Sequence, residues 1–357
     1  MSDVQKVLVS LHLLSTSATG LLDALTSPSP PNPPLPLPQL HADLLRLLSL
    51  IYANTTKLTL ALNPPDLTPS YNAALVPLND LTAHLSTLAS NAVSFDPREH
   101  GRALASEVQH TVKDVIIAVQ ELVQAHSVAI SATEDLRPAG KGKGKGEEYM
   151  IKTATVHQLI ERARLPGDDG ISSSNAKAVR KRWNEQGDIL QDAVAELDDD
   201  DRESGNDDSI GEEDEFDLSA GVLSDEEREF KKRLHAIVIR LSSAYNDVAS
   251  NLLAPTSPLH PSAVALDRLL DTAVPLTRAV DDFAASVYEG PGGLIVPKKA
   301  LVKALRSMAK AIDDLWGDAP PDESEVVARG SRRWFLEETK ALLLCIASLR
   351  WPGESKH

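Results

Sequence analysis

Apolar residues recur at intervals of three and four along most of this chain. The N-terminal stretch shows the spacing clearly, at Val4, Val7, Leu11, Leu14, Ala18, Leu21 and Leu25. Residues at this spacing lie on one stripe of an α-helix, which has about 3.6 residues per turn. The pattern returns in the segments 40–62, 71–88, 108–126, 149–163, 179–197, 234–252, 266–287, 302–315 and 334–349. The sequence therefore predicts about ten amphipathic helices.

The composition favours helices over strands. Aromatic residues make up only 4% of the chain, and the apolar residues are mainly Leu, Ala and Val, a mixture typical of helices. No stretch of four to eight residues alternates apolar and polar side chains between turn signals, as a half-buried strand does. We therefore expect an all-α fold of two antiparallel helical bundles.

A dense run of acidic residues divides the predicted helices into two groups. Glu196 to Asp217 holds thirteen acids against one base, Arg202, and so carries about −12 of the net charge of −16. Such a segment cannot bury enough apolar surface to offset the entropy lost on ordering, so we expect a disordered linker. The predicted organisation is an N-terminal bundle over 1–198, an acidic linker over 199–223 and a C-terminal bundle over 224–352.

Two further linkers are expected inside the first bundle. The proline-rich stretch 27–38 cannot continue a helix and is typical of a stiff connector. Its PxxP spacing also fits an SH3 ligand, and this alternative stays open. The stretch 137–148 contains GKGKGKG, which lacks both the spacing of a phosphate-binding loop and a strand before it. We interpret it as a flexible basic linker.

Signatures of chemistry are missing from the sequence. It has no GxSxG, HExxH or EF-hand pattern, and its ten histidines form no close pair at metal-ligand spacing. The single cysteine, Cys345, excludes an intramolecular disulfide and a multi-cysteine metal site, and its Leu-rich surroundings predict a packed thiol. We therefore predict no catalytic, cofactor-binding or metal-binding residue, no cofactor and no enzymatic activity.

The charge and hydropathy patterns also bear on partners and location. Outside the acidic run the chain is nearly neutral, which argues against direct binding of nucleic acid, since that requires a basic face. No run approaches the roughly 20 uncharged apolar residues that span a bilayer. Asp3 precedes the N-terminal apolar run and Lys6 is its only basic leader, so a bundle helix is favoured over a signal peptide. A reducing compartment fits the single cysteine.

Two charged features have an open interpretation. A basic cluster within AKAVRKRW contains Lys177, Arg180, Lys181 and Arg182. It fits a nuclear-import patch, although a solvated helix face is the favoured interpretation. Ser204, Ser209 and Ser224 each have an acid three residues on, the context of acid-directed kinases, and are candidate phosphoacceptors or plain polar spacers. Ser224 is also the expected N-cap of a helix, because DEE follows it.

The stretch AVDDFAASVYEGPGG (279–293) is predicted to be the end of a structural helix. Phe283 and Val287 continue the apolar stripe, whereas Asp281 and Asp282 point away from it and do not converge on one reactive atom. Gly290 is placed to end the helix in a left-handed cap. This pattern favours a helix end over the wall of an active site.

Three stretches, in their order and spacing, resemble the cyclin-D-binding (cyclin-D-interacting) protein family. They are IYANTTKLTLAL (51–62), RWNEQGDILQDAVAELDDDD (182–201) and AVDDFAASVYEGPGG (279–293). The resemblance covers most of the chain from about residue 40 to residue 316. The proline-rich stretch 27–38 and the GKGKGKG linker depart from it.

The resemblance implies a non-enzymatic protein of two helical bundles, similar in architecture to those of talin and vinculin. It implies binding to D-type cyclins and helix-loop-helix transcription factors, restraint of the cell cycle and of transcription by sequestration, and location in both nucleus and cytoplasm. Asp281, Asp282 and Tyr288 then become candidate partner contacts. A cytoskeletal or membrane-adjacent scaffold of talin or vinculin type is the alternative, and the sequence does not fix the oligomeric state.

Overall fold

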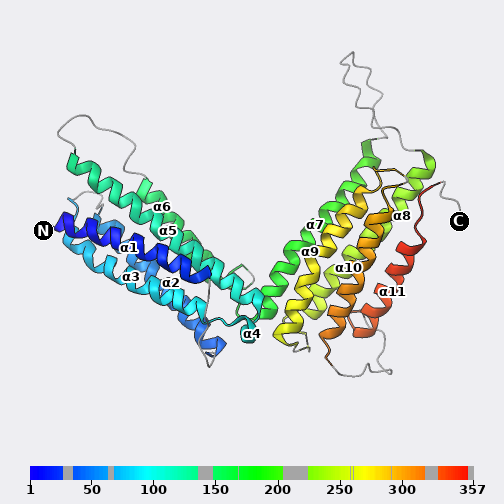
Figure 1. The fold of residues 1–357 in the computed structure, drawn as a ribbon, viewed down its shortest axis with the longest axis horizontal. Helices are drawn as coiled ribbons and strands as arrows, with labels where there is room; N and C mark the ends of the chain where they lie inside the picture. Colours follow the sequence, from blue (N-terminus) through cyan, green and yellow to red (C-terminus); the bar gives the residue numbers. More distant parts are fainter. Residues whose placement is uncertain are drawn as a thin grey trace, which may run out of the picture. The chain divides into compact units, whose positions relative to one another are not determined.

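The described part of the chain is entirely helical in its regular structure. The computed structural model describes residues 1–26, 35–62, 68–135, 148–167, 169–203, 224–257, 259, 261–290, 292–317 and 329–352. These residues form eleven α-helices and one π-helical turn (Figure 1). The predicted all-α class is confirmed. The helices form two compact units, residues 1–178 and 179–357.

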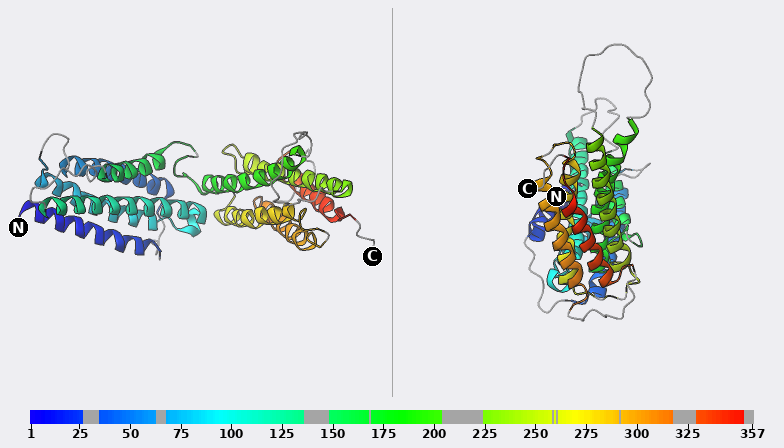
Figure 2. Two further views of the ribbon diagram at one scale, coloured as in Figure 1. Left: turned by 90° about the horizontal axis from the view of Figure 1, so that it is seen from above. Right: turned by 90° about the vertical axis from the view of Figure 1, so that its right-hand side faces the viewer.

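Unit 1 is a closed ring of five packed helices with one short helix at its end. Its helices are α1 (Asp3–Thr26), α2 (Leu37–Leu62), α3 (Tyr71–Val93), the short α4 (Pro97–His100), α5 (Arg102–Asp135) and α6 (Glu148–Arg164). In this described part, α2 packs on α3, α3 on α1, α1 on α5, α5 on α6 and α6 on α2. Helices α3 and α5 also pack on each other. Each helix therefore has at least two neighbours that cover its apolar stripe, and Figure 2 shows the helices lying side by side.

The corner before α5 depends on a glycine. Asp96 caps α4 by accepting a hydrogen bond from the backbone of Arg98. Gly101 follows with φ +90°, and a Cβ there would lie 2.0 Å from the side chain of Asn175. The Asn175 Oδ1 accepts from the Leu104 backbone N–H at 3.2 Å, satisfying a donor at the start of α5. Only glycine fits this approach.

Unit 2 is built from α7 (Asn175–Glu203), α8 (Asp225–Asp247), the π-helical turn η1 (Val248–Leu252), α9 (Ala263–Ala285), α10 (Ile295–Asp314) and α11 (Arg332–Ser348). In the described part, α8 packs on α9, α9 on α10, α10 on α11 and α11 on α8. These four helices close a second ring. The division between the two units falls within α7, after its first turn.

Helix α7 packs in the second unit through a buried aromatic pair and a hydrogen bond to α9. Trp183 is fully buried and stacks on Tyr245 of α8 with ring centroids 4.2 Å apart. The Trp183 Nε1–H donates to the Tyr245 carbonyl at 3.1 Å, and the Tyr245 hydroxyl donates to the Trp183 carbonyl at 3.0 Å. Thr277 of α9 donates to Gln186 of α7 at 3.2 Å. The predicted N-terminal bundle 1–198 is thus too long, because most of α7 packs in the other unit.

The bounds of the three predicted linkers also change. Helix α7 continues to Glu203, so residues 199–203 of the predicted linker 199–223 are helical. Helix α2 begins at Leu37, within the predicted linker 27–38, because a proline such as Pro38 is tolerated in the first turn of a helix. Helix α6 includes Glu148, the last residue predicted for the linker 137–148. The remainder of the three linkers lies outside the described residues.

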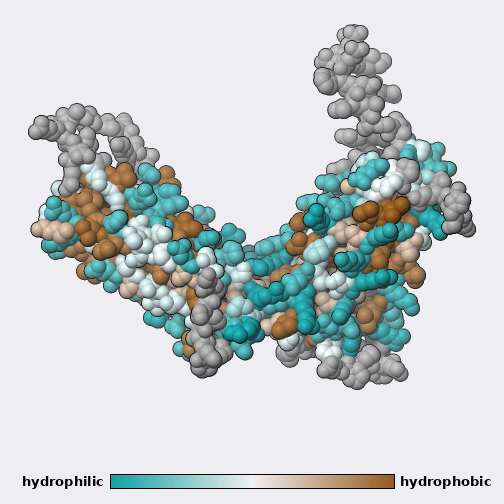
Figure 3. Space-filling view, viewed as in Figure 1, coloured by the Kyte–Doolittle hydropathy of each residue, from teal (hydrophilic) through white to brown (hydrophobic). Residues whose placement is uncertain are grey.

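Helix α1 is the one described helix that is long and apolar enough, by length and composition, to cross a membrane. Its stripe of apolar residues packs on α3 and α5. The buried members are Val7, Leu11, Leu14, Ala18 and Leu25, which follow the predicted spacing. On the face drawn in Figure 3, hydrophobic residues form separate patches among hydrophilic ones.

Candidate protein-binding surface

The three residues predicted to contact a partner lie at the C-terminal end of α9. Asp281 and Asp282 are exposed, whereas Phe283 beside them is fully buried. Tyr288, which follows the helix, is 59% exposed. The predicted division into two faces is therefore confirmed, and the two carboxylates lie on the solvent side. Their role as partner contacts stays a prediction.

The α-helix α9 ends before Gly290, the residue at which the sequence predicts its end. The last helical residue is Ala285, and the buried Ser286 hydroxyl donates to the Phe283 carbonyl at 2.6 Å. The Tyr288 backbone N–H then donates to the Ala285 carbonyl at 3.0 Å, so the chain winds on with bonds between residues three apart. Gly290 has φ +79°, the left-handed conformation that the sequence predicts. It ends this turn and not the α-helix itself.

A groove opens between α10 and the C-terminal end of α11. Its volume is about 930 Å³, and apolar and basic side chains line it. The lining residues are Leu294, Ile295, Lys298, Lys299, Val302, Lys303, Arg306, Ala347, Leu349 and Arg350. Sequence reasoning missed this groove. The signal was present in α10, where Ile295, Lys298, Lys299, Val302, Lys303 and Arg306 recur at helical spacing.

The walls of the groove are fixed by contacts on both sides. Lys298 Nζ donates to the carbonyl oxygens of Ala347 and Leu349 at 3.0 and 2.7 Å, and so satisfies acceptors at the end of α11. Leu349 is buried, as is Trp351 beyond it. The Trp351 ring lies 4.6 Å from that of Phe230 on α8. The segment after α11 is therefore held against both α10 and α8.

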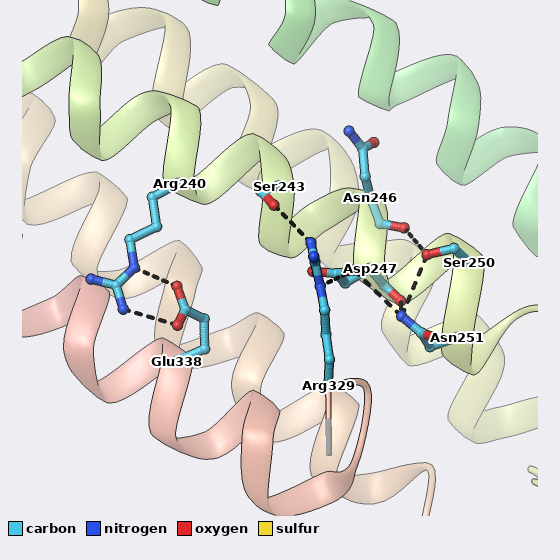
Figure 4. A network of polar contacts seen from close by, with 8 residues as sticks. All are labelled: Arg240, Ser243, Asn246, Asp247, Ser250, Asn251, Arg329 and Glu338. Atoms are coloured by element: carbon cyan, nitrogen blue, oxygen red, sulfur yellow. Dashed lines mark hydrogen bonds and ion pairs between the residues drawn. The ribbon is translucent and has the colours of Figure 1, made fainter. Parts of the chain in front are cut away.

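A polar network attaches α11 and the residues before it to α8 (Figure 4). Arg329 binds both carboxylate oxygens of Asp247, with Nε–Oδ1 and Nη2–Oδ2 distances of 3.0 and 2.9 Å. The Asp247 side chain is only 10% exposed and lies where α8 passes into η1. Arg240 of α8 and Glu338 of α11 form a second bidentate ion pair, with a distance of 2.9 Å from Nη2 to Oε2. The network holds α11 and the residues before it against α8, and its ion pairs and hydrogen bonds are structural contacts.

In unit 1, the stretch IYANTTKLTLAL forms a polar seam, which we define as Tyr52, Asn54, Thr55, Thr56 and Thr59 of α2 with their partners on α3 and α6. Asn54 contacts His84 of α3 at 3.1 Å. Thr59 contacts Thr153 of α6 at 2.9 Å. The Tyr52 hydroxyl donates to Glu161 of α6 at 3.0 Å.

His157 of α6 lies at the centre of the seam. Its Nε2 is 3.2 and 3.1 Å from the hydroxyls of Thr55 and Thr56, and its ring stacks on Tyr52 at 3.9 Å. Both threonine hydroxyls donate to the Tyr52 carbonyl, so each has only lone pairs left and Nε2 must carry the proton. Burial lowers the pKa of His157, which favours the neutral ring.

The α5–α6 contact includes a second buried histidine. His126 of α5 is 1% exposed, and its ring stacks on Tyr149 of α6 with centroids 5.4 Å apart. Burial lowers its pKa from 6.5 to about 4, because an apolar environment disfavours the charged ring. Its Nε2 has no hydrogen-bond partner among the residues that the structure describes. The ring is therefore a packed, neutral side chain.

The candidate modification sites have different outcomes. Ser224 is described, and its side chain completes a capping box with Glu227 at the start of α8, as the sequence predicts. Ser204 and Ser209 lie outside the described residues, as do most of the proline-rich stretch and the GKGKGKG repeat. The side chains of Lys177 and Arg180 in the basic cluster are half-buried. Part of each side chain is therefore covered by neighbouring residues.

The remaining chemical features are structural. Cys345 of α11 is half-buried and lies 4.0 Å from Arg240, so it is less enclosed than the sequence predicts. Among the described residues, no group of three or more His, Cys, Asp or Glu side chains could hold a metal ion. Two of the described surfaces are candidates for binding a partner protein: the end of α9 and the groove between α10 and α11.

A comparison with protein families gives one match, over part of the chain. Residues 43–202 match the family model described as Grap2 and cyclin-D-interacting, N-terminal. The matched stretch is a little under half of the chain and runs from α2 into α7. It contains both the polar seam and Trp183. No curated protein matches the chain.

Proposed function

We propose that the protein acts by binding other proteins and not by catalysis, because residues 43–202 match the family model described as Grap2 and cyclin-D-interacting, N-terminal. The family match is the observation that carries this proposal. It agrees with the resemblance of the stretches 51–62 and 182–201 to cyclin-D-interacting proteins, since both lie within the matched residues. The all-α fold supports the proposal, because rigid helical faces are common docking surfaces for helices of a partner.

The proposed partners are cyclin-like and helix-loop-helix proteins. Binding would sequester them and so restrain the cell cycle and transcription, in both cytoplasm and nucleus. The charge distribution supports sequestration over action on DNA, because the acidic run would repel phosphate groups. The same run favours encounter with basic partner surfaces.

We assign the partner contact in unit 2 to the end of α9. Tyr288, just after the helix, is exposed, as are Asp281 and Asp282 in its last two turns. Tyrosine is enriched among the residues that dominate interface energies, since it offers a large rigid surface and a polar tip. The two exposed carboxylates in the last turns of the same helix would select a basic partner surface and speed the encounter.

The test is a binding measurement between the full chain and a purified D-type cyclin or helix-loop-helix domain. The variant combining Asp281→Lys, Asp282→Lys and Tyr288→Ala should bind at least about tenfold more weakly, with an unchanged helical signal because all three side chains are exposed. The control variant, Asp188→Lys with Asp192→Lys, reverses two exposed acids of α7 and should bind normally. Equal binding by both variants would refute the α9 surface, and no binding by the unaltered chain would refute the partner class.

A scaffold role of talin or vinculin type is the second candidate. It is favoured by the same observation of two helical units, since fold alone does not decide function. Co-sedimentation of the full chain with actin filaments, together with no binding to either partner class, would support this candidate over the first.

A further inference from the structure

We propose that the groove between α10 and the end of α11 binds an acidic amphipathic helix of a partner protein. The groove lies at residues 294–350, outside the stretch 43–202 that matches the family model. The inference therefore goes beyond the proposed function and does not depend on binding to a D-type cyclin. It rests on the floor, the rim and the rigidity of the groove.

The floor of the groove is apolar. Leu294 and Leu349 are buried beneath it, Val302 is half-buried, and Ile295 is 50% exposed. Removing such apolar surface from water favours a complex. Large side chains of a partner would therefore find apolar contacts along the whole floor.

The rim of the groove is basic. Five cationic side chains line it, and none of the described lining residues is acidic. They are Lys298, Lys299, Lys303, Arg306 and Arg350. This local excess is opposite in sign to the net charge of −16 of the chain. Charge complementarity thus selects an acidic partner and disfavours a basic one.

The shape of the groove fits a helix. Ile295 and Val302 lie seven residues apart on α10, which is about 10 Å at 1.5 Å per residue. Apolar side chains of a partner helix at i, i+3 or i+4 and i+7 cover the same length. Acids flanking that stripe would reach Lys299 and Lys303 on the rim. A partner helix of about three turns is long enough for these contacts.

The groove is formed before a partner arrives. Lys298 connects α10 to the last carbonyls of α11, and Trp351 packs on Phe230 beyond them. A preformed site loses less conformational entropy on binding than one that must be ordered. The Lys298 ammonium therefore both holds the wall and contributes to the positive rim.

The experiment uses the full chain and a labelled 18-residue helical peptide with leucines on one face and glutamates beside them. Fluorescence anisotropy measures the affinity. The variant Lys299→Glu with Lys303→Glu should bind at least about tenfold more weakly, since each change replaces an attraction by a repulsion. The control variant, Lys232→Glu with Lys340→Glu, makes the same charge change at exposed sites of α8 and α11 outside the groove and should bind as the unaltered chain does.

Further arms separate the proposal from its alternatives. A peptide with the same composition but a scrambled order should bind at least about tenfold more weakly, because it lacks the apolar stripe. Equal binding of the scrambled peptide would overturn the proposal in favour of unspecific charge attraction. Binding to phosphatidylserine vesicles without binding to the peptide would overturn it in favour of a membrane surface. Self-association that the groove variant abolishes, without peptide binding, would overturn it in favour of a second copy of the chain.

Discussion

Replacing Trp183 by alanine should destabilise unit 2 and leave unit 1 unchanged. Trp183 is fully buried between α7 and α8, stacks on Tyr245, and donates its indole N–H to the Tyr245 carbonyl. The substitution removes all of these contacts and leaves a cavity. It therefore tests whether α7 is part of the folded core of unit 2.

The expected loss of stability is large. Replacement of a buried tryptophan by alanine costs about 3–5 kcal/mol. The upper part of this range applies here, because a stacked aromatic pair adds about 0.5–1.5 kcal/mol and the indole hydrogen bond to the Tyr245 carbonyl is also lost. At an m-value of about 2–3 kcal/mol/M, the urea midpoint should fall by roughly 1–2.5 M.

The tryptophans of the chain give a convenient assay. All four of them, Trp183, Trp316, Trp334 and Trp351, lie within residues 179–357. Tryptophan fluorescence therefore follows the unfolding of unit 2, and circular dichroism follows both units. In the variant, the transition followed by fluorescence should move to lower urea, and the remaining part of the helical signal should unfold where it does in the unaltered chain.

An exposed neighbour provides the control. Ile189 lies on the same helix and is 44% exposed, so Ile189→Ala should change the free energy of unfolding by less than about 0.5 kcal/mol. An unchanged fluorescence midpoint in Trp183→Ala would refute the assignment of α7 to unit 2. A shift confined to the part of the helical signal from unit 1 would refute it equally.

Three other predictions concern single contacts. The folded-state pKa of His126 lies near 4, below 6.5, so the unfolded chain binds a proton first as the pH falls; unit 1 should lose up to about 3 kcal/mol between pH 6.5 and 4. Hydrogen exchange of α5 and α6 measures this loss, and His126→Leu should remove that pH dependence. Arg329→Ala leaves the buried Asp247 carboxylate without its bidentate partner and should cost unit 2 about 1–3 kcal/mol in a urea titration; no change would show that Arg329 does not stabilise α8. Ser224→Ala breaks the capping box and should lower the stability of unit 2 by about 1 kcal/mol, whereas Ser224→Asp should retain most of it.

Much of the fold follows from local sequence pattern. The 3.6-residue periodicity predicted the number and approximate extent of the long helices, because burial of one stripe is what stabilises each helix in a bundle. The Ser224 cap and the left-handed Gly290 were also predicted, since both depend on residues next to each other in the chain. The short α4 and the π-helical turn were not, because four or five residues show no periodicity.

The candidate sites followed the same rule. The exposure of Asp281 and Asp282 was predicted from their position on the helix. The groove was missed because it needs α10 and the end of α11 together, and Lys298 meets the Leu349 carbonyl across 51 residues of sequence. The polar seam was recognised only as a family-like string, since its partners on α3 and α6 are 30 or more residues away.

The sequence by itself determined the helical class, the solvent-facing acids of α9 and the acidic run that makes a charge boundary at residues 196–217. Only the tertiary structure decided which helices share a core. The charge boundary suggested that α7 belongs to the first bundle, but the Trp183–Tyr245 pair joins it to α8. The physical reason is that periodicity shows which face of a helix is buried, whereas the partner of that face depends on side-chain packing between segments far apart in the chain.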